Sequence, residues 1–559
     1  MGISQQYFKG SPPRQGESID LDYFCNEIAT LGSDSSPFII TQEKERTMGI
    51  KNKLIAMYTR KPFRTFEDAL RHPEKIESEN WKRLLGFYRK GSFWNERAPK
   101  ALASGKLQEF PLSEYEDYKA CIDQSQKTGI NPMTGEEVVF FADSAGTTSY
   151  PKVFPITDSF RKDYKETQAP FVHRLCQDFR HFLDKPALYL TATNSSKRAE
   201  CGIEVGYISN FNYRNMPKVL ASFYAIPKQV LQDEHTFRTW APVYALAQEI
   251  SAIFVITPFV LCEFFKQIER KKDFLLRALE GKEPIPAGFP PLRVSQSRLK
   301  SLRSAFSKET FSIQDLWKQL SFVCTWKASL AGLQVPELQA WIPDIPILDG
   351  TYSATEAWFN VPWFRDKLGG PLSHKSGIFE FLPVGKELAK RNLLHSWELK
   401  KNTDYEVFVT TSMGMIRYRL KDIVTCTDFV HRSPVIHFKY KAENLISLST
   451  LRLSEDQLAQ CLANLGIRDL AHVRIAPASD GARLLVAMGE GLGITQEAFE
   501  NELQALSPYY GEERAAQHVG ASQMIFLPKS HEIFQRVRHA QSKPSLISKV
   551  PFDAALGLS

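Results

Sequence analysis

The sequence of 559 residues lacks any long hydrophobic run. Its most apolar stretch, residues 253–265, contains Pro258 and Glu263, whereas a membrane-spanning helix needs about 20 mostly apolar residues. No two of the eight cysteines have CxxC spacing, which excludes the common zinc and dithiol motifs. Scattered cysteines are typical of reduced, buried thiols. We therefore expect a cytoplasmic protein with no membrane partner.

The sequence also lacks a strong excess of charge. Lys and Arg number 70 against 63 Asp and Glu, which gives a net charge of +7. This mild balance suits a small anionic ligand and, without a long basic run, does not indicate nucleic acid. The 12 histidines form no recognisable motif, and no Ser-His-Asp or Cys-His set is evident.

Short apolar strands alternate with helical stretches through much of the chain. This alternation predicts a layered α/β core with a largely parallel sheet. Apolar spacing predicts helices over residues 41–97 (broken near Pro62 and Pro73), 114–126, 158–183, much of 217–247, and from Pro258, with Thr257 as N-cap, to about residue 279. The expected strands are 137–141, 187–191, 252–256 and 322–326, and a β-rich section follows with strands at 380–383, 405–412, 415–420, 423–427 and 434–440.

The sequence pattern changes near residue 441. Ser454 and Gln457 form a capping box that opens a helix. A hairpin turning at Asp480-Gly481, a helix over 496–506 and a strand over 523–527 complete a compact α+β unit. The predicted organisation is a polar lead-in (1–37), a large α/β domain with layered sheets and a β-rich subdomain (38–440), and a small α+β C-terminal domain (441–559).

One stretch, FFADSAGTTSYPKVFPIT over residues 140–157, gathers small and hydroxylated residues behind an apolar strand. Small residues let backbone N–H groups approach a phosphate, hydroxyls add donors, and Lys152 adds a charge. An ordinary Ser/Thr/Gly turn is the alternative. Because ligands bind beyond the carboxyl ends of parallel strands, we expect this loop to lie at that edge of the sheet.

Two further clusters contain suitable chemistry for a nucleotide. Tyr352 can stack on a planar base, and Thr355 with Glu356 can hold a hydrated Mg²⁺. Asp422, after a basic and aromatic strand, can accept two ribose hydroxyls. The alternatives are a polar strand end with a solvated glutamate and a surface ladder of ion pairs.

The three clusters, in this order, resemble the nucleotide-binding motifs of the auxin-conjugating acyl acid amido synthetases, a family of adenylate-forming enzymes. The similarity extends over about residues 40–559. The first family motif, S-S-G-T-T-x-G-x-x-K-x-x-P, is matched by Ser144, Gly146, Thr147, Thr148, Lys152 and Pro155; the second, Y-x-x-S/T-E, by Tyr352, Thr355 and Glu356; and the third, Y-R-x-x-D-x-V, by Tyr418, Arg419, Asp422 and Val424.

The C-terminal part resembles the small mobile domain of the same superfamily. The segment FKYKAENLISLSTLRLSEDQL is similar to the bacterial pattern F-x-G-R-x-x-D-x-x-S-L-x-G-E-K-L-x-E, which puts Lys441 at the hinge arginine and Arg452 at the motif lysine. Lys549 resembles the lysine near the family's C-terminus that meets the phosphate.

The resemblance implies a reaction in two steps. A carboxylic acid is adenylated by Mg-ATP, and an amine, typically an amino acid, then takes the acyl group and releases AMP. Lys152 and the first motif would hold the phosphates, Glu356 would orient Mg²⁺, and Lys549 would complete the site as the small domain closes. Tyr352 would pack on adenine, Asp422 would hold the ribose, and Thr355, Tyr418 and Lys441 would border the nucleotide.

Two alternatives remain open. One is an adenylating ligase that passes the acyl group to coenzyme A or a carrier thiol. The other is a non-catalytic descendant that binds a nucleotide or an acyl acid. The loop within residues 140–157 favours the non-catalytic descendant over the ligase that uses a thiol. This loop is one residue shorter than the family motif and lacks its second glycine.

Overall fold

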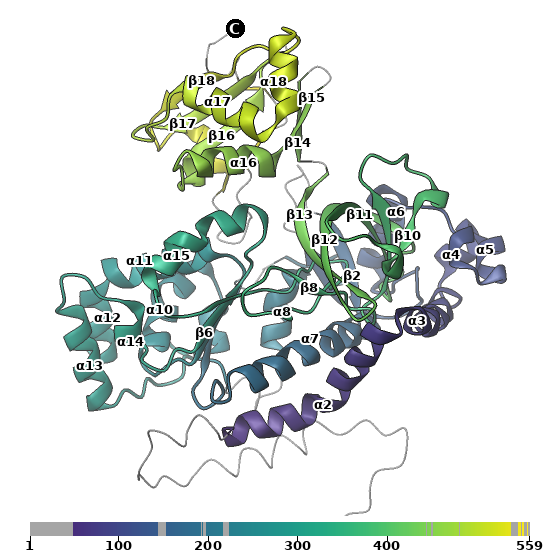
Figure 1. Cartoon of the computed structure of the whole chain (residues 1–559). Helices are drawn as coiled ribbons and strands as arrows, with labels where there is room; N and C mark the ends of the chain where they lie inside the picture. The colour runs from purple at the N-terminus through teal and green to yellow at the C-terminus, as the bar shows by residue number, and fades with distance from the viewer. Residues whose placement is uncertain are drawn as a thin grey trace, which may run out of the picture.

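The computed structural model describes most of the chain from residue 48 onward (Figure 1). The predicted lead-in at 1–37, the first-motif residues Ser144, Gly146, Thr147 and Thr148, and Lys549 all lie outside the described residues. The described residues are 48–143, 152–191, 193, 197–215, 223–442, 444–448, 451–479, 481–537, 546–548, 551–552 and 556.

The N-terminal described part is helical, as the sequence predicts. The prediction that the helix breaks at Pro62 is wrong, because α2 continues through it. Ile55, Phe63 and Phe66 on the two sides of Pro62 are buried, and this packing outweighs one lost backbone hydrogen bond. The helices here are α2 (Ile50–Arg71), α3 (Pro73–Tyr88), α4 (Ser92–Arg97), α5 (Pro99–Ser104) and α6 (Tyr115–Thr128).

A small sheet follows, in which β1 (Val138–Asp143) pairs antiparallel with β2 (Val153–Thr157) and parallel with β4 (Val205–Gly206). The predicted phosphate loop therefore joins two antiparallel neighbours. The expectation that it follows a strand of the parallel sheet is wrong. The physical reason is its length, since parallel strands need a crossover of about a dozen residues or more.

The parallel sheet has the order β3-β5-β6-β7. Thr257 stands at the N-cap of α11 as predicted, but its side chain makes no capping bond. A helix is expected over much of 217–247; in the described part of this range, residues 223–247, the α-helix begins at Glu234, where the Asp233 side chain accepts from the Thr236 N–H. The strands are β3 (Ala187–Leu190), β5 (Ala252–Val255), β6 (Phe322–Thr325) and β7 (Ile347–Asp349); the helices of this region are α7 (Asp158–Asp178), α8 (Ile208–Arg214), α10 (Glu234–Leu246), α11 (Pro258–Arg270), α12 (Lys272–Leu279), α13 (Gln296–Phe306), α14 (Ile313–Leu316) and α15 (Val335–Trp341).

The β-rich section forms a six-stranded antiparallel sheet in the order β10-β9-β11-β12-β13-β8. The two strands predicted at 415–420 and 423–427 are one long strand, β12. It absorbs a positive φ of 62° at Lys421 and a register shift after Ile423, which is how a bulged strand keeps its pairing. The strands are β8 (Gly370–Pro371), β9 (Ile378–Pro383), β10 (Leu394–His395), β11 (Thr403–Thr410), β12 (Tyr418–Val430) and β13 (Ser433–Lys441).

The elements beyond β13 lie above the rest in Figure 1. Their buried side chains form a hydrophobic cluster of their own. The predicted capping box at Ser454 is confirmed. Leu330 and Leu333 of the 3-10 turn η3 (Ser329–Gln334) pack against this cluster from the large part. The elements are β14 (Leu445–Leu448), β15 (Leu451–Ser454), α16 (Glu455–Asn464), β16 (Val473–Pro477), β17 (Leu484–Gly489), α17 (Gln496–Leu506), α18 (Pro508–Ala515) and β18 (Gln523–Leu527).

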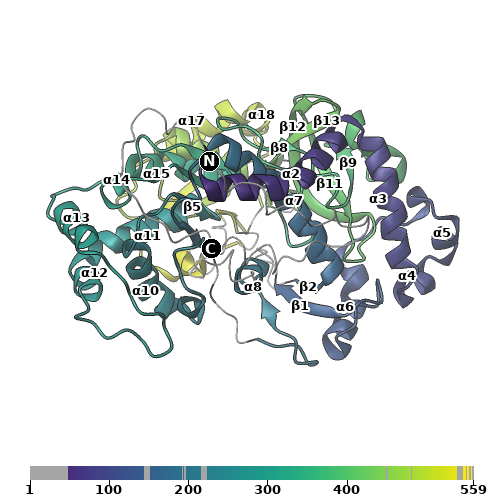
Figure 2. The same ribbon diagram turned by 90° about the horizontal axis from the view of Figure 1, so that it is seen from below.

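Seen from below, the helices of the parallel sheet and the helices α3–α6 lie on opposite sides of the molecule (Figure 2). Helices α2 and α7 lie between them. They are tied together by a 2.9 Å hydrogen bond between Thr59 and His173. Among the described residues, no helix combines the length and the apolar character that crossing a bilayer requires.

Candidate active site

The first pair of site residues lies at the end of the six-stranded sheet. Strands β12 and β13 pair so that Asp422 is opposite Lys441. Lys441 Nζ lies 2.7 Å from Asp422 Oδ1. The side chain of Asp422 is 5% exposed and that of Lys441 is 37% exposed. The acid is thus fixed inside the sheet, whereas its cation reaches solvent and can exchange at small cost.

Tyr352 reaches the same carboxylate from the other sheet. The chain leaves β7 and turns back on itself, since Tyr352 N–H donates to Asn360 Oδ1 at 2.8 Å and Phe359 N–H donates to the Tyr352 carbonyl at 3.0 Å. The Tyr352 hydroxyl donates to Asp422 Oδ2 at 2.7 Å. Its ring stacks on Phe359 with centroids 4.2 Å apart. Burial and the charge of Asp422 raise the pKa of Tyr352, so it stays a donor.

Glu356 occupies the bend of the same turn and is buried. Burial raises the pKa of its carboxyl, and the positive charges of Lys441 and Lys152 act against that rise. Burial also raises the pKa of Tyr418, and the charge of Glu356 adds to it. Residues that the sequence singled out from three separate segments therefore share one electrostatic environment.

Lys152, immediately before β2, is held beside α6. Its ammonium lies 5.3 Å from the centroid of the Tyr115 ring. The Tyr115 hydroxyl accepts from the Val153 N–H at 3.0 Å, which fixes this end of the strand. Thr355 is half-buried next to Glu356. Within the described residues, no group of three or more His, Cys, Asp or Glu side chains is arranged to hold a metal ion.

The alternative interpretation of the basic residues around Tyr418 is a ladder of ion pairs on the surface. In the structure, these arginines pair with buried glutamates instead. Arg417 is 1% exposed and makes two contacts with Glu380, at 2.8 and 2.7 Å. Its Nη1 also donates to the carbonyls of Gln108 and Phe110. Arg419 pairs at 2.6 Å with Glu406, whose side chain is 8% exposed. The buried pair anchors the strand that carries the site.

Sequence reasoning missed the aromatic residues that border this site. Trp326, just after β6, lies parallel to Phe438 of β13, with centroids 6.2 Å apart and planes 5° from parallel. Trp326 Nε1 donates to the Thr351 carbonyl at 3.0 Å. Phe438 also contacts the Tyr352 ring. Their sequence positions gave no sign of this contact, because it joins two sheets more than 100 residues apart.

Comparison with known protein families identifies the family of the chain. Residues 63–347 match the GH3 family N-terminal domain, and residues 370–441 match the GH3 family central domain. The chain belongs to the GH3 family. The two matched segments contain Lys152, Tyr418, Asp422 and Lys441, whereas Tyr352 and Glu356 lie between them.

Individual relatives within the GH3 family are distant. A jasmonoyl–L-amino acid synthetase of Nicotiana attenuata is 22% identical over 432 residues, covering 70% of this chain and 73% of the relative. A putative indole-3-acetic acid-amido synthetase of Oryza sativa subsp. japonica is 28% identical over 153 residues, which are 26% of this chain and 32% of that protein. Some matches thus span only about a third of the relative.

The fold agrees with a solved GH3 structure. The acyl acid amido synthetase AtGH3.15 in complex with 2,4-DB superposes with a TM-score of 0.75, covering 90% of this chain and 96% of that one, at 13% identity. The predicted layered α/β fold is therefore confirmed.

Proposed function

We propose that this chain is an ATP-dependent acyl acid amido synthetase of the cytoplasm. A carboxylate oxygen of the acid bonds to the α-phosphorus of ATP, and pyrophosphate leaves. The amine of an amino acid then attacks the activated carbonyl, loses a proton, and displaces AMP to leave an amide. Family membership and the convergence of Tyr352, Asp422, Lys441 and Glu356 support this proposal, and the convergence is the observation that carries it.

Asp422 is proposed to hold the ribose. Its carboxylate is already oriented by the Tyr352 hydroxyl on one oxygen. The other oxygen faces the half-exposed Lys441, and a ribose hydroxyl would take over or share this oxygen. Tyr352, Trp326 and Phe438 offer aromatic surface for the adenine. Tyr418 is proposed to border the nucleotide from the same strand.

The residues present fit a magnesium ion. Mg²⁺ keeps several waters and phosphate oxygens and needs only one or two protein oxygens, which Glu356 and the neighbouring Thr355 supply. A carboxyl whose pKa is raised by burial gains from a nearby cation. When bound, the ion would neutralise charge that builds up on the phosphates.

Lys152 is proposed to contact the phosphates, together with Ser144, Gly146, Thr147 and Thr148 of the first motif. Preorganised positive charge at this point stabilises the developing charge of the transition state. We propose residues 38–440 as the large domain and 441–559 as the small one, which would bring Lys549 to the reaction and exclude water on closing. Ser548, one residue before Lys549, pairs with Ile475 of β16.

The decisive experiment is incubation of the full chain with ATP, magnesium and a panel of carboxylic and amino acids, read by mass spectrometry. We expect an amide together with AMP and pyrophosphate. Glu356→Gln should lower amide formation about 100-fold or more, since it removes a charged group at the reacting phosphates. Glu387→Gln, an exposed carboxylate, is the matched control. A thioester formed only with coenzyme A, or no ATP turnover at all, would contradict the proposal.

A further inference from the structure

A cleft of about 340 Å³ lies between α3, the first turns of α7 and the 373–377 loop that connects β8 to β9. Its volume lies at the lower end of the roughly 300–1,000 Å³ that small-molecule sites occupy. Residues from three separate segments line it, among them Arg83, Lys162 and Lys375. It is separate from the proposed reaction centre.

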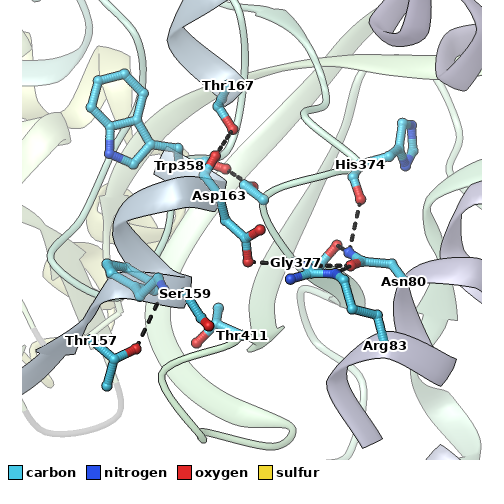
Figure 3. A network of polar contacts seen from close by, with 12 residues as sticks. Asn80, Arg83, Thr157, Ser159, Asp163, Thr167, Trp358, His374, Gly377 and Thr411 are labelled. Carbon is cyan, nitrogen blue, oxygen red and sulfur yellow. Dashed lines mark hydrogen bonds and ion pairs between the residues drawn. The ribbon is translucent and has the colours of Figure 1, made fainter. Parts of the chain in front are cut away.

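The inner wall of the cleft is a preorganised polar network (Figure 3). The Asn80 amide donates to the carbonyls of His374 and Gly377 at 3.2 and 3.1 Å. Arg83 donates to Asn80 Oδ1 and pairs at 3.0 Å with Asp163, whose side chain is 8% exposed. Each buried group is thus fixed before any ligand arrives, which lowers the entropic cost of binding.

The remaining charge of the cleft is positive. Arg83 and Asp163 neutralise each other. Lys162 and Lys375 also line the cleft, and neither forms an ion pair with any residue in the described part of the chain. Glu79 is the other acid of the lining, so two ammonium groups face one carboxylate. The amino end of α7, where Lys162 lies, adds a partial positive charge.

One wall is apolar. Ile76 and Phe87 of α3 face the same space, and the Arg83 guanidinium lies 5.9 Å from the Phe87 ring centroid. An inorganic anion would leave this surface unused. A ligand with a carboxylate and an apolar body would use both the lysines and the ring.

We propose that this cleft is a second ligand site, which binds a small organic carboxylate. None of its lining residues belongs to the proposed reaction centre: on α7, Asp163 lines the cleft, whereas the next residue, Tyr164, contacts Trp358, two residues from Glu356. Two sources share the chemistry: a free carboxylic acid, and an N-acyl amino acid that keeps one carboxylate.

The test is a ¹⁹F NMR titration of the full chain, without ATP, using 4-fluorophenylacetate and its glutamate conjugate. Lys162→Ala combined with Lys375→Ala should weaken binding of the probe at the cleft about tenfold, because two charged contacts are lost, and should leave any binding at the reaction centre unchanged. Lys82→Ala removes an exposed lysine of α3 outside the lining and should leave binding at both places unchanged. The tighter of the two probes identifies the source.

Inorganic phosphate at matched ionic strength should displace the probe at least tenfold less effectively than phenylacetate. Equal displacement, or unchanged binding in the double lysine variant and in Lys162→Glu, would overturn the proposal. The outcome is independent of the proposed function. If no amide is ever formed, the difference between the lysine variant and Lys82→Ala still decides whether the cleft binds a carboxylate.

Discussion

Two ion pairs border strand β12, and they differ in burial and in geometry. Arg417 and Glu380 meet through two contacts with side chains 1% and 6% exposed. Lys441 and Asp422 meet through one contact of 2.7 Å, and the lysine is 37% exposed. The first pair has no route to solvent, so it can only hold the strand. The second can release its cation, and the acid then becomes available to a ligand.

This difference explains why the same strand can be both rigid and functional. The φ of Arg417 is 49°, a conformation that non-glycine residues adopt only when their surroundings enforce it. Four oxygens accept from its guanidinium, two of Glu380 and one each of Gln108 and Phe110. Arg417 directly precedes β12, so these contacts hold the part of the strand that carries Asp422.

The largest effect is expected when the buried pair is broken. Arg417→Met should lower the free energy of unfolding by about 3–5 kcal/mol, because Glu380 is left charged and buried. Urea unfolding of the full chain measures this loss. Arg391→Met, which breaks the exposed pair with Glu387, should change it by less than about 0.5 kcal/mol. Similar losses in the two variants would show that burial does not distinguish the pairs.

The next effect is on the nucleotide. Asp422→Ala should weaken ATP binding about 10–100-fold, as expected for lost hydrogen bonds to a charged group, and should leave the fold intact. Calorimetric titration with ATP and magnesium, without a carboxylic acid, measures it. Asp404→Ala removes another aspartate of the same sheet, which pairs with Lys439 at 2.7 Å, and should bind ATP normally. An unchanged affinity in Asp422→Ala would remove the assigned ribose role.

A smaller effect is expected at the pair of Lys441 and Asp422, whose lysine reaches solvent. Lys441→Gln should change the free energy of unfolding by less than about 1 kcal/mol, because Lys441 is 37% exposed and the Tyr352 hydroxyl still donates to Asp422 after the lysine is removed. The same urea experiment compares it with Arg417→Met. A loss of about 3 kcal/mol or more would place Lys441 with the structural pairs and contradict the exchange of its contact for a ribose hydroxyl.

The elements that the sequence predicted best are those with local signals. The helix Gln496–Leu506 and the strand Gln523–Leu527 were predicted with their observed bounds, and the helix after Ser454 was predicted from its capping box. Which strands pair with each other was harder to predict. The hairpin β14–β15 was missed and β12 was split in two, since strand pairing depends on partners far away in the sequence.

The site shows the same division. Residue types and motif order predicted that Tyr352, Glu356 and Asp422 act together. Nothing in the sequence indicated that the Tyr352 hydroxyl donates to Asp422 or that Lys441 occupies its other oxygen. The roles of these residues, and of Lys549, remain predictions. Burial separated Arg417 from its neighbour Arg419, and burial is set by packing between elements that no local pattern encodes.

A third pair lies between these extremes. His395 Nδ1 is 2.9 Å from Glu77 Oε1, with side chains 30% and 13% exposed. The contact with Glu77 raises the pKa of His395, whereas burial acts to lower it. A histidine pKa raised by folding adds stability below its unfolded value near pH 6.5, and this stability is lost as the pH rises through the folded pKa.

Glu77→Gln should therefore change the slope of stability against pH. In the wild type His395 contributes a fall of less than about 1 kcal/mol in the free energy of unfolding between about pH 6 and pH 8, against the rise contributed by His173, His374 and His437, whose pKa values burial lowers. Without the Glu77 charge, burial becomes the leading influence on the pKa of His395, so stability should rise more steeply over the same interval than in the wild type. Urea midpoints across this range measure the slope, with Glu387→Gln as the exposed control. If Glu77→Gln keeps the wild-type slope, His395 is not the group that titrates. Only two kinds of ion pair would then remain: the buried pair of Arg417 with Glu380, and the pair of Asp422 with the solvent-exposed Lys441.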